Sequence, residues 1–385
     1  MRGQVAIIGI GIEGLSPLSP ELSYREMIHA AAVDAYTDAG IEPDDIDSAV
    51  TVAEDLFEGV SIFDEYTPDQ LGAVLKPVHT IAGDSLQGLG AAALQIATGA
   101  FDIIVLEAHS KASNISDIRE LETYALDPTW NRQLGYPAEA LAGMEMARFL
   151  HDSGNTPEHC ARVVVDNRAN ARTNPHGAYG GETSIDTVLG SRLQSTPLRA
   201  AEIAPAADGA VVLVLASREI AGAAGRRPVW IEGLSWSTDH PAIEDRDLGR
   251  AAYCEQAAAR AYAMAGIEDP VSAFDFAEVD DRYAYKQLQH LEALGLCATG
   301  EAGSRTQGGH FGAGGVLPVN PSGGSLGAGH LFDAAGLYKI AESAHQLRGD
   351  AGALQIPDAN RCLVQSWRGV PTATGGVAVL SNHHE

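Results

Sequence analysis

The chain has 385 residues, of which 25 are Lys or Arg and 51 are Asp or Glu, so its formal net charge is −26. This charge argues against a nucleic-acid backbone or an anionic membrane surface as the partner, because both attract basic proteins. Hydrophobic residues make up 45% of the chain and charged residues 20%, which is typical of a folded protein rather than a disordered one. The length predicts about two to three domains.

The cysteines show no spacing typical of a zinc site or of a disulfide framework. They are Cys160, Cys254, Cys297 and Cys362. Only four apolar residues, Val5–Ile8, precede the first glycine of the N-terminal strand, which is too few for a secretion signal. No run of 18 apolar residues occurs. We therefore expect a cytoplasmic protein with reduced thiols and no membrane span.

One supersecondary unit occurs twice in the chain. Residues 31–42 and 257–268, which begin 226 positions apart, are both alanine-rich and both reach glycine at the tenth position, as a helix with a glycine cap would. Each predicted helix follows an apolar strand, at residues 5–8 and 229–231, and precedes an acidic turn and a further strand. The sequence therefore predicts two related α/β halves.

Residues 9–14, Gly-Ile-Gly-Ile-Glu-Gly, match the GxGxxG pattern of dinucleotide-binding loops. Such a site needs a helix that starts inside the loop and meets the pyrophosphate with its N-terminus. Pro17 and Pro20 prevent a helix there. We interpret the segment as a turn at the end of a strand.

The remaining elements follow in chain order. We predict a helix at 89–98 and buried strands at 101–106, 210–215 and 375–380, where apolar runs have the length of strands. Residues 112–195 are mixed and polar, with glycine and proline between two helical stretches. This segment is typical of an insertion that lies on the first half.

Residues 320–330, Asn-Pro-Ser-Gly-Gly-Ser-Leu-Gly-Ala-Gly-His, are the most informative segment. Their small side chains allow the backbone to approach a ligand closely. Asn320, Gly323, Gly324 and His330 resemble the Asn-x-x-Gly-Gly…Gly-His-Pro signature of the thiolase superfamily, with leucine in place of the final proline. Three other segments resemble the same superfamily: Gln95–Gly99, Pro205–Ala210 and Leu291–Gly303. The last of these resembles its sterol-carrier-type and archaeal branch.

The resemblance covers nearly the whole chain and agrees with the internal repeat. It implies the α/β thiolase fold, with two βαβαβαββ halves in a five-layer αβαβα arrangement and an inserted loop domain. Residues 1–111 and 196–227 would form the N-terminal half, residues 112–195 the loop domain and residues 228–385 the C-terminal half.

The resemblance also implies a nucleophile position, and this chain departs from it. Counting back 17 residues from Gly99 places Ala82 where the family has its nucleophilic cysteine. Alanine cannot hold an acyl group. Ser85 lies nearby, but one turn further along a helix would displace the reacting atom by about 5 Å.

The remaining catalytic candidates lie in the second half. His330 matches the family histidine that acts on the oxygen or on a proton of a CoA thioester. Asp280 stands where the branch has a histidine, and Asp281 and Tyr283 are neighbouring acid–base groups. Asn320 completes the expected catalytic set.

Binding of CoA requires positive charge on an acidic protein. Arg168 and Arg172 lie four residues apart, on one face of a helix in the expected loop domain, which covers the CoA tail in the family. Solvated arginines on an exposed helix are an equally good interpretation. Gly323 and Gly324 would allow a close approach to CoA. We expect no metal and no bound cofactor, with coenzyme A arriving as part of the substrate.

Three functions stay open. The loss of the cysteine favours a carbon–carbon lyase, a (retro-)aldolase of a 3-hydroxyacyl-CoA, since no acyl group is held on that enzyme. The first alternative is acyl transfer through another nucleophile such as Ser85. The second is a non-catalytic CoA-binding subunit. The resemblance further implies a homodimer and a small partner subunit with a zinc ribbon and an OB-fold that binds acyl-CoA.

Overall fold

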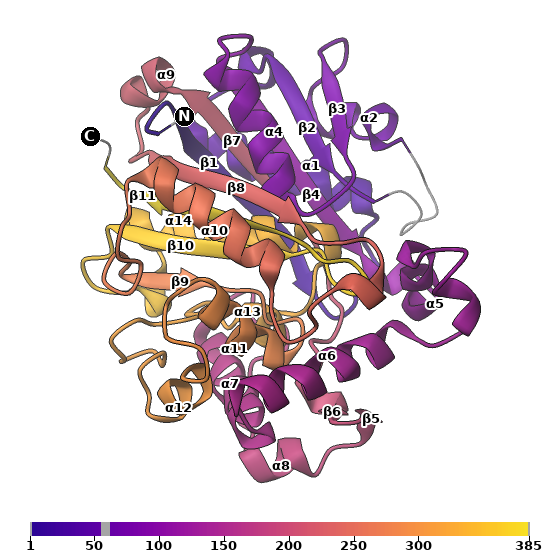
Figure 1. The fold of residues 1–385 in the computed structure, drawn as a ribbon. Coiled ribbons are helices and arrows are strands. Elements are labelled where there is room, and N and C mark those ends of the chain that lie inside the picture. The colour runs from indigo at the N-terminus through magenta and orange to yellow at the C-terminus, as the bar shows by residue number, and fades with distance from the viewer. Residues whose placement is uncertain (1, 55–61, 384–385) are drawn as a thin grey trace.

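The computed structural model describes residues 2–54 and 62–383 and is an α/β protein (Figure 1). Within these residues nine strands pair in the order β3-β2-β4-β7-β1-β8-β11-β10-β9, and β5 pairs with β6. The strands are β1 (Val5–Ser16), β2 (Ser48–Val52), β3 (Val78–Ile81), β4 (Ile103–Lys111), β5 (Leu193–Ser195), β6 (Leu198–Arg199), β7 (Asp208–Ser217), β8 (Val229–Thr238), β9 (Phe276–Glu278), β10 (Arg361–Trp367) and β11 (Thr374–Ser381).

The helices fall into three groups along the chain. The first half contains α1 (Tyr24–Ala39), α2 (Phe63–Tyr66), α3 (Pro68–Leu71), α4 (Ser85–Ala97) and α9 (Arg218–Ala223). The inserted segment contains α5 (Ile118–Glu122), α6 (Ala138–Ser153), α7 (Pro157–Asn170) and α8 (Ile185–Leu189). The second half contains α10 (Ala252–Ala265), α11 (Ala284–Ala293), α12 (Ala302–Gln307), α13 (Gly324–Ala328) and α14 (Ala335–Arg348).

The predicted repeat is confirmed. In the first half β1, β7, β4 and β2 are neighbours in that order, and in the second half β8, β11, β10 and β9 are. The pairings among these strands also match: β2–β4 and β9–β10 are parallel, whereas β1–β7, β4–β7, β8–β11 and β10–β11 are antiparallel. The helices α1 and α10 both end at a left-handed glycine, Gly40 and Gly266, as expected from the sequence.

Two helices form a layer between the halves. α4 contacts β2, β4 and β7 of the first half, β8 and β11 of the second, and α14. Leu86, Leu89, Leu337 and Ile340 of these helices are fully buried in one core with strands from both halves, and burying each such side chain contributes about 1.5–3 kcal/mol. The outer faces are covered by α1 on β1 and β7, and by α10 on β8 and β11. The result is the expected αβαβα order of layers.

The GxGxxG segment is not a turn at a strand end, as expected, but part of the long strand β1. A Cβ at Gly9 would lie 2.3 Å from the carbonyl oxygen of Ala35, and one at Gly11 would lie 1.8 Å from that of Ala31. Glycine is therefore required because α1 packs directly on the strand backbone. The pattern reports close helix–strand packing rather than a nucleotide site.

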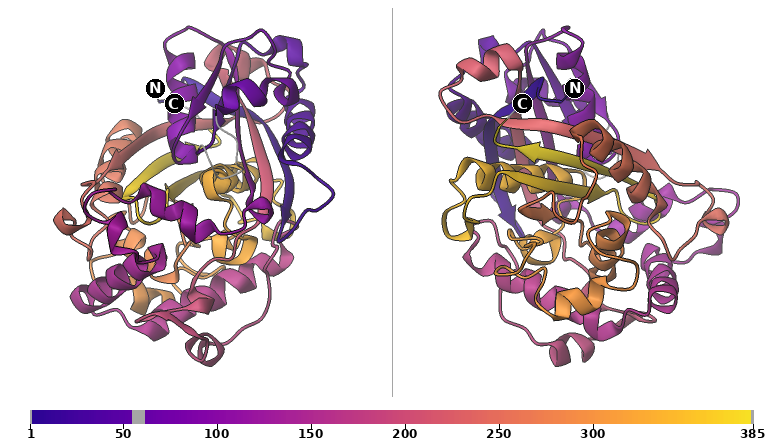
Figure 2. Two further views of the ribbon diagram at one scale, coloured as in Figure 1. Left: turned by 90° about the vertical axis from the view of Figure 1, so that its right-hand side faces the viewer. Right: turned by 60° about the vertical axis from the view of Figure 1, so that its left-hand side comes forward.

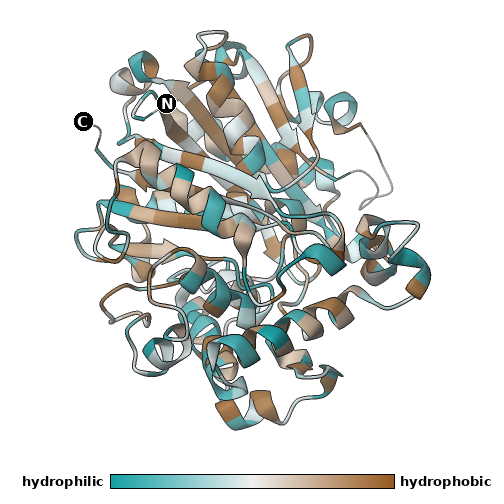
Figure 3. Cartoon of the chain, viewed as in Figure 1, coloured by the Kyte–Doolittle hydropathy of each residue, from teal (hydrophilic) through white to brown (hydrophobic). Residues whose placement is uncertain are grey.

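The second half departs from the implied repeat at its outer edge. Beyond β9 the described residues form a single parallel bridge, between Ala277 and Val319, in place of a strand equivalent to β3. The helices α5–α8 of the insertion lie below the sheets, away from the two chain ends, which are near each other (Figure 2). In α6 and α8 hydrophilic and hydrophobic residues alternate, as in helices with one face in solvent (Figure 3). Among the described helices, none is long and apolar enough to cross a bilayer.

Candidate active site

Four segments far apart in the sequence meet at one end of the α4 and α14 layer. The Ser85 hydroxyl, at the start of α4, donates to the Asp333 carbonyl oxygen, and the Glu54 backbone N–H after β2 donates to the Asp333 carboxylate at 2.6 Å. The Ser366 hydroxyl at the end of β10 donates to Asp84. α14 approaches through Gly336, where a Cβ would lie 2.8 Å from Ser366 Oγ and 3.1 Å from Ser85 Cβ.

His330 is buried in this region with its backbone fixed. Its N–H donates to the Pro205 carbonyl at 2.7 Å, and its carbonyl accepts from Ala207 N–H at 3.1 Å. Neither ring nitrogen has a hydrogen-bond partner among the described residues. Burial, with help from the positive charges of Arg282 and Lys339, lowers the pKa of His330 well below its ordinary value. The imidazole is therefore neutral, with one N–H and one lone pair available to a ligand.

Asp280 lies at the same end of the molecule, beyond β9. Burial raises its pKa to about 6, against the opposing influence of Lys339. The Lys339 ammonium is 3.9 Å from Asp280 Oδ2 and donates to Ser325 Oγ at 3.1 Å. Asp280 Oδ1 accepts from Arg282 N–H at 3.1 Å, whereas Oδ2 has no hydrogen-bond partner among the described residues. A carboxyl with this pKa can exchange a proton near neutral pH.

Lys339 is a residue that the sequence reasoning missed. Its side chain is fully buried and favours the charged form of Asp84 and Asp280 and the neutral form of His330. A signal existed in the sequence: a lysine between Leu337 and Ile340 in the helix that follows His330 cannot reach water once that helix lies between two sheets.

Asp281 and Asn320 have their polar atoms occupied by the protein. Asp281 accepts from Ser325 N–H at 2.6 Å and Leu326 N–H at 2.9 Å, so it caps α13, and it accepts from Asn167 at 2.7 Å. Asn320 Oδ1 accepts from Val279 N–H at 2.7 Å, and its amide donates to Gln287 at 2.8 Å. These contacts support the backbone around Asp280 and His330, while a direct part in catalysis stays a prediction.

Tyr283 is also buried, and burial raises its pKa to about 12. Its ring packs against the Arg282 guanidinium at 5.7 Å and against Tyr285 and Trp367 at about 6 Å. The phenol is therefore protonated at neutral pH. Its direct part in catalysis also stays a prediction.

The nucleophile position differs from the expectation in one respect. Ala82 is exposed and precedes the helix, whereas Asp84 caps α4 and Ser85 is its first residue, both buried. Ser85 therefore does not lie one turn further along a helix that contains Ala82, as expected, because Ala82 is not helical. Asp84 and Ser85 are the side chains that face the interior at this helix start.

All four cysteines lie elsewhere. They are in α7, in α10, after α11 and at the start of β10, and all are buried free thiols. Burial raises the pKa of each above its ordinary value. A protonated buried thiol is a poor nucleophile, so the structure places no reactive sulfur at the start of α4.

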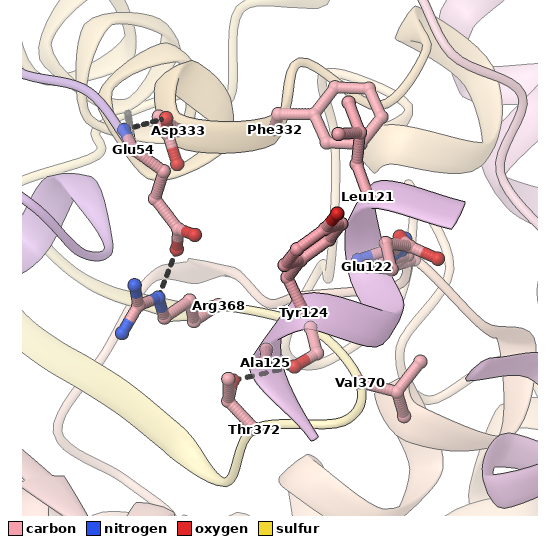
Figure 4. Close-up of a pocket in the computed structure, with 12 residues that line it drawn as sticks. Glu54, Leu121, Glu122, Tyr124, Ala125, Phe332, Asp333, Arg368, Val370 and Thr372 are labelled. Carbon is pink, nitrogen blue, oxygen red and sulfur yellow. Dashed lines mark hydrogen bonds and ion pairs between the residues drawn. The ribbon is translucent and has the colours of Figure 1, made fainter. Parts of the chain in front are cut away.

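A cavity of about 250 Å³ opens beside the cluster (Figure 4). Two ion pairs line it, Arg282 with Glu122 and Arg368 with Glu54. The Phe332 ring also lines the cavity and lies 4.7 Å from the His330 ring. The other lining residues are Leu121, Tyr124, Ala125, Asp333, Gly369, Val370 and Thr372. The cavity therefore reaches the cluster at Asp333.

The predicted CoA-binding residues have distinct surroundings. Arg172 is exposed and pairs with Glu182 at 2.6 Å, whereas Arg168 is half-buried and its Nε has no partner among the described residues. Gly323 packs against Ala171, where a Cβ would lie 2.5 Å from the alanine methyl, and Gly324 packs against the Asp281 carboxylate. Both glycines serve close packing here, and a contact with CoA stays a prediction.

Comparisons with known proteins agree on one superfamily. Residues 235–382 match the family described as thiolase C-terminal domain-like. The chain is 29% identical to an acetyl-CoA acetyltransferase of Methanothermobacter thermautotrophicus, with 98% of each chain covered. It is also 29% identical to the 17-hydroxy-3-oxo-4-pregnene-20-carboxyl-CoA lyase of Mycobacterium tuberculosis, over 97% of this chain and 98% of the lyase.

Solved structures with the same fold include the Ltp2-ChsH2(DUF35) aldolase, with a TM-score of 0.85 and 25% identity over 99% of this chain and 98% of that one. The human mitochondrial 3-ketoacyl-CoA thiolase has a TM-score of 0.74 over 98% of each chain, and at 14% identity it supports the fold alone. The relatives thus include enzymes named for acyl transfer and enzymes named for carbon–carbon cleavage.

Proposed function

We propose that this chain cleaves the C2–C3 bond of a 3-hydroxyacyl-CoA by a retro-aldol reaction. The chain belongs to the thiolase superfamily, in its sterol-carrier-type branch, and is an enzyme that acts on acyl-CoA thioesters. The products are an aldehyde or ketone and a shortened acyl-CoA. One observation carries the proposal: the start of α4 presents Asp84 and Ser85 without a thiol, and the buried His330 imidazole has no hydrogen-bond partner among the described residues.

The chemistry divides between two residues. The proton of the 3-hydroxyl leaves, its electron pair forms the new carbonyl at C3, and the electrons of the C2–C3 bond move into a thioester enolate. The His330 N–H stabilises the enolate oxygen, since a preorganised donor in a dry site acts where charge develops. Asp280 supplies the proton that C2 takes up. No acyl group is transferred to the protein, so no nucleophile is required.

Acyl transfer through Ser85 is the second candidate, favoured by the relatives named acetyl-CoA acetyltransferase. Ser85 is buried at the N-terminus of α4, but its hydroxyl donates to the Asp333 carbonyl, which cannot take its proton. An unactivated serine is a weak nucleophile. A covalent acyl adduct after incubation with acyl-CoA would favour this candidate over the lyase.

Partners and substrate binding extend the same proposal. The substrate brings coenzyme A, and Arg168 binds one of its phosphates, since its guanidinium has an unpaired N–H and a phosphate accepts two such bonds. The aldolase with the same fold is named as a complex with a DUF35 protein. A homodimer with a small zinc-ribbon and OB-fold subunit is therefore the assembly that we propose for this chain.

The direct test is product release. The purified full chain, alone and with any subunit that co-purifies, is incubated with linear, branched and ring-bearing 3-hydroxyacyl-CoA thioesters, and aldehydes and ketones are trapped as hydrazones. We expect a carbonyl product and an acyl-CoA in equal amounts. Absence of release across this panel would overturn the proposal, and unchanged complex activity in His330→Ala would support a non-catalytic subunit instead.

A further inference from the structure

A carboxyl–hydroxyl pair joins the two halves of the protein beside the proposed reaction centre. Asp84, the N-cap residue of α4, is 4% exposed, and Ser366 of β10 is fully buried. The Ser366 hydroxyl donates to Asp84 Oδ1, and the Leu86 backbone N–H donates to the same oxygen at 2.9 Å. Both hydrogen bonds end on Oδ1.

The charges around Asp84 come from three elements. Burial raises the pKa of Asp84, whereas the Ser366 hydroxyl, the Leu86 N–H, Lys339 of α14 and Arg368 after β10 lower it. Asp280, after β9, is close enough for the Asp84 carboxylate to contribute to its raised pKa. Asp84 is therefore a buried carboxyl with raised proton affinity, which is the property that a general base needs.

The proposed reaction requires a base that accepts the proton of the 3-hydroxyl group. His330 and Asp280 Oδ2 lack hydrogen-bond partners among the described residues, so their polar atoms are available to a ligand. In the proposed reaction His330 acts on the thioester oxygen and Asp280 on C2, which leaves the 3-hydroxyl proton without an acceptor. Among the side chains at the start of α4, Asp84 can accept a proton, and Ser85 donates its own to a carbonyl.

We propose that Asp84 is the general base that removes the 3-hydroxyl proton, and that Ser366 is the positioning residue that orients it. This inference rests on the proposed retro-aldol function. The Asp84 Oδ2 lone pair takes the proton, the O–H electrons form the C3 carbonyl, the C2–C3 bond breaks into the enolate, and C2 is protonated by Asp280. As the products leave, Asp84 returns its proton to water and Asp280 takes one up from water, so both carboxyl groups regain their starting forms.

The alternative is that Asp84 only caps α4, as aspartate commonly does. The substitution Asp84→Asn separates the two roles, because asparagine caps a helix about as well as aspartate but cannot take a proton. We expect kcat for cleavage to fall about 10²–10⁴-fold, the usual contribution of a general base. We expect the unfolding midpoint in urea to stay unchanged.

The matched control is Asp47→Asn. Asp47 also accepts from two backbone N–H groups, those of Asp102 and Ile103, but it is exposed at the other end of β4. Cleavage by this variant should equal that of the wild type. A second readout is exchange of the C2 hydrogens of an acyl-CoA that lacks the 3-hydroxyl, in D₂O, which needs Asp280 but not Asp84. Asp84→Asn should keep this exchange, and its loss would mean that the site has been distorted and would overturn the inference.

Ser366→Ala tests the positioning role. The variant loses one donor to Asp84, so the pH at which kcat/KM reaches half its maximum should move upward, with kcat reduced less than in Asp84→Asn. Cleavage by Asp84→Asn at the wild-type rate overturns this inference while the lyase proposal stands. Absence of cleavage by the wild type itself overturns the lyase proposal, so the two failures are distinguishable.

Discussion

Substitution of the buried His330 should change stability and activity in opposite directions. His330→Leu replaces the ring with an apolar side chain of similar size among Phe332 and other packed residues. The wild-type ring has two nitrogens without a partner among the described residues. The substitution removes a polar group whose burial is unfavourable unless a substrate is bound.

The magnitudes follow from this geometry. A buried polar group without a hydrogen bond costs about 1–3 kcal/mol, so the free energy of unfolding of His330→Leu should equal or exceed that of the wild type by about 1 kcal/mol. Loss of a preorganised donor to an enolate oxygen costs about 10²–10³-fold in kcat. The neutral ring makes this loss independent of pH between about 6 and 9, because the pKa of His330 lies well below that range.

Urea unfolding and the rate of carbonyl release measure the two effects. The control is His345→Leu, in the same helix-rich half, where the exposed ring pairs with Asp350 at 2.8 Å and should matter little to activity. Cleavage by His330→Leu within about threefold of the wild-type rate would refute the oxyanion role, because an N–H donor is worth far more. A clear loss of stability would refute the claim that the ring lacks a protein partner.

Three further predictions concern single residues. Exchange of the C2 hydrogens in D₂O should rise with pH through about 6 and then level off, because Asp280 must be ionised to take the proton, and Asp280→Asn should give a slow, flat profile. Burial raises the pKa of Glu278 to about 8, so the ionisation of this group lowers the free energy of unfolding of the wild type as the pH rises from about 4.5 to 8. Glu278→Gln lacks this loss, so its stability in urea relative to the wild type should be greater at pH 8 than at pH 5. The difference is several kcal/mol at most, since each tenfold change in proton affinity is about 1.4 kcal/mol. Arg168→Ala should raise KM for the CoA thioester about tenfold, the value of one charge-assisted hydrogen bond, and Arg172→Ala should leave it nearly unchanged because Arg172 already pairs with Glu182.

The parts of the fold that could be predicted are those with local signals. Short segments of the sequence show the glycine caps at Gly40 and Gly266 and the apolar strand before each helix. The repeated half could therefore be recognised from the sequence. The GxGxxG segment was misjudged because a glycine required by helix packing and one required by a turn look alike in one sequence. Only the position of α1 on β1 separates them.

Site residues could be predicted from the sequence only where they belong to a recognisable motif. His330 was found from the segment that begins at Asn320. Asp84 and Ser366 are 282 positions apart, and their contact depends on two helices meeting between two sheets. Lys339 influences the site because it is buried, and it is buried because α14 lies between the two sheets. Contacts between distant segments produce no periodic pattern in the sequence. The acid–base groups around the start of α4 could therefore be identified only from the structure.

Mass spectrometry of the intact protein during turnover distinguishes retro-aldol cleavage from acyl transfer. The chain is mixed with a 3-hydroxyacyl-CoA that it cleaves, quenched at intervals, and examined for both the carbonyl product and covalent modification. We predict carbonyl release with the protein mass unchanged at every time. A transient acyl adduct on Ser85 that forms and decays at the rate of turnover would contradict the account and return the protein to acyl-transfer chemistry.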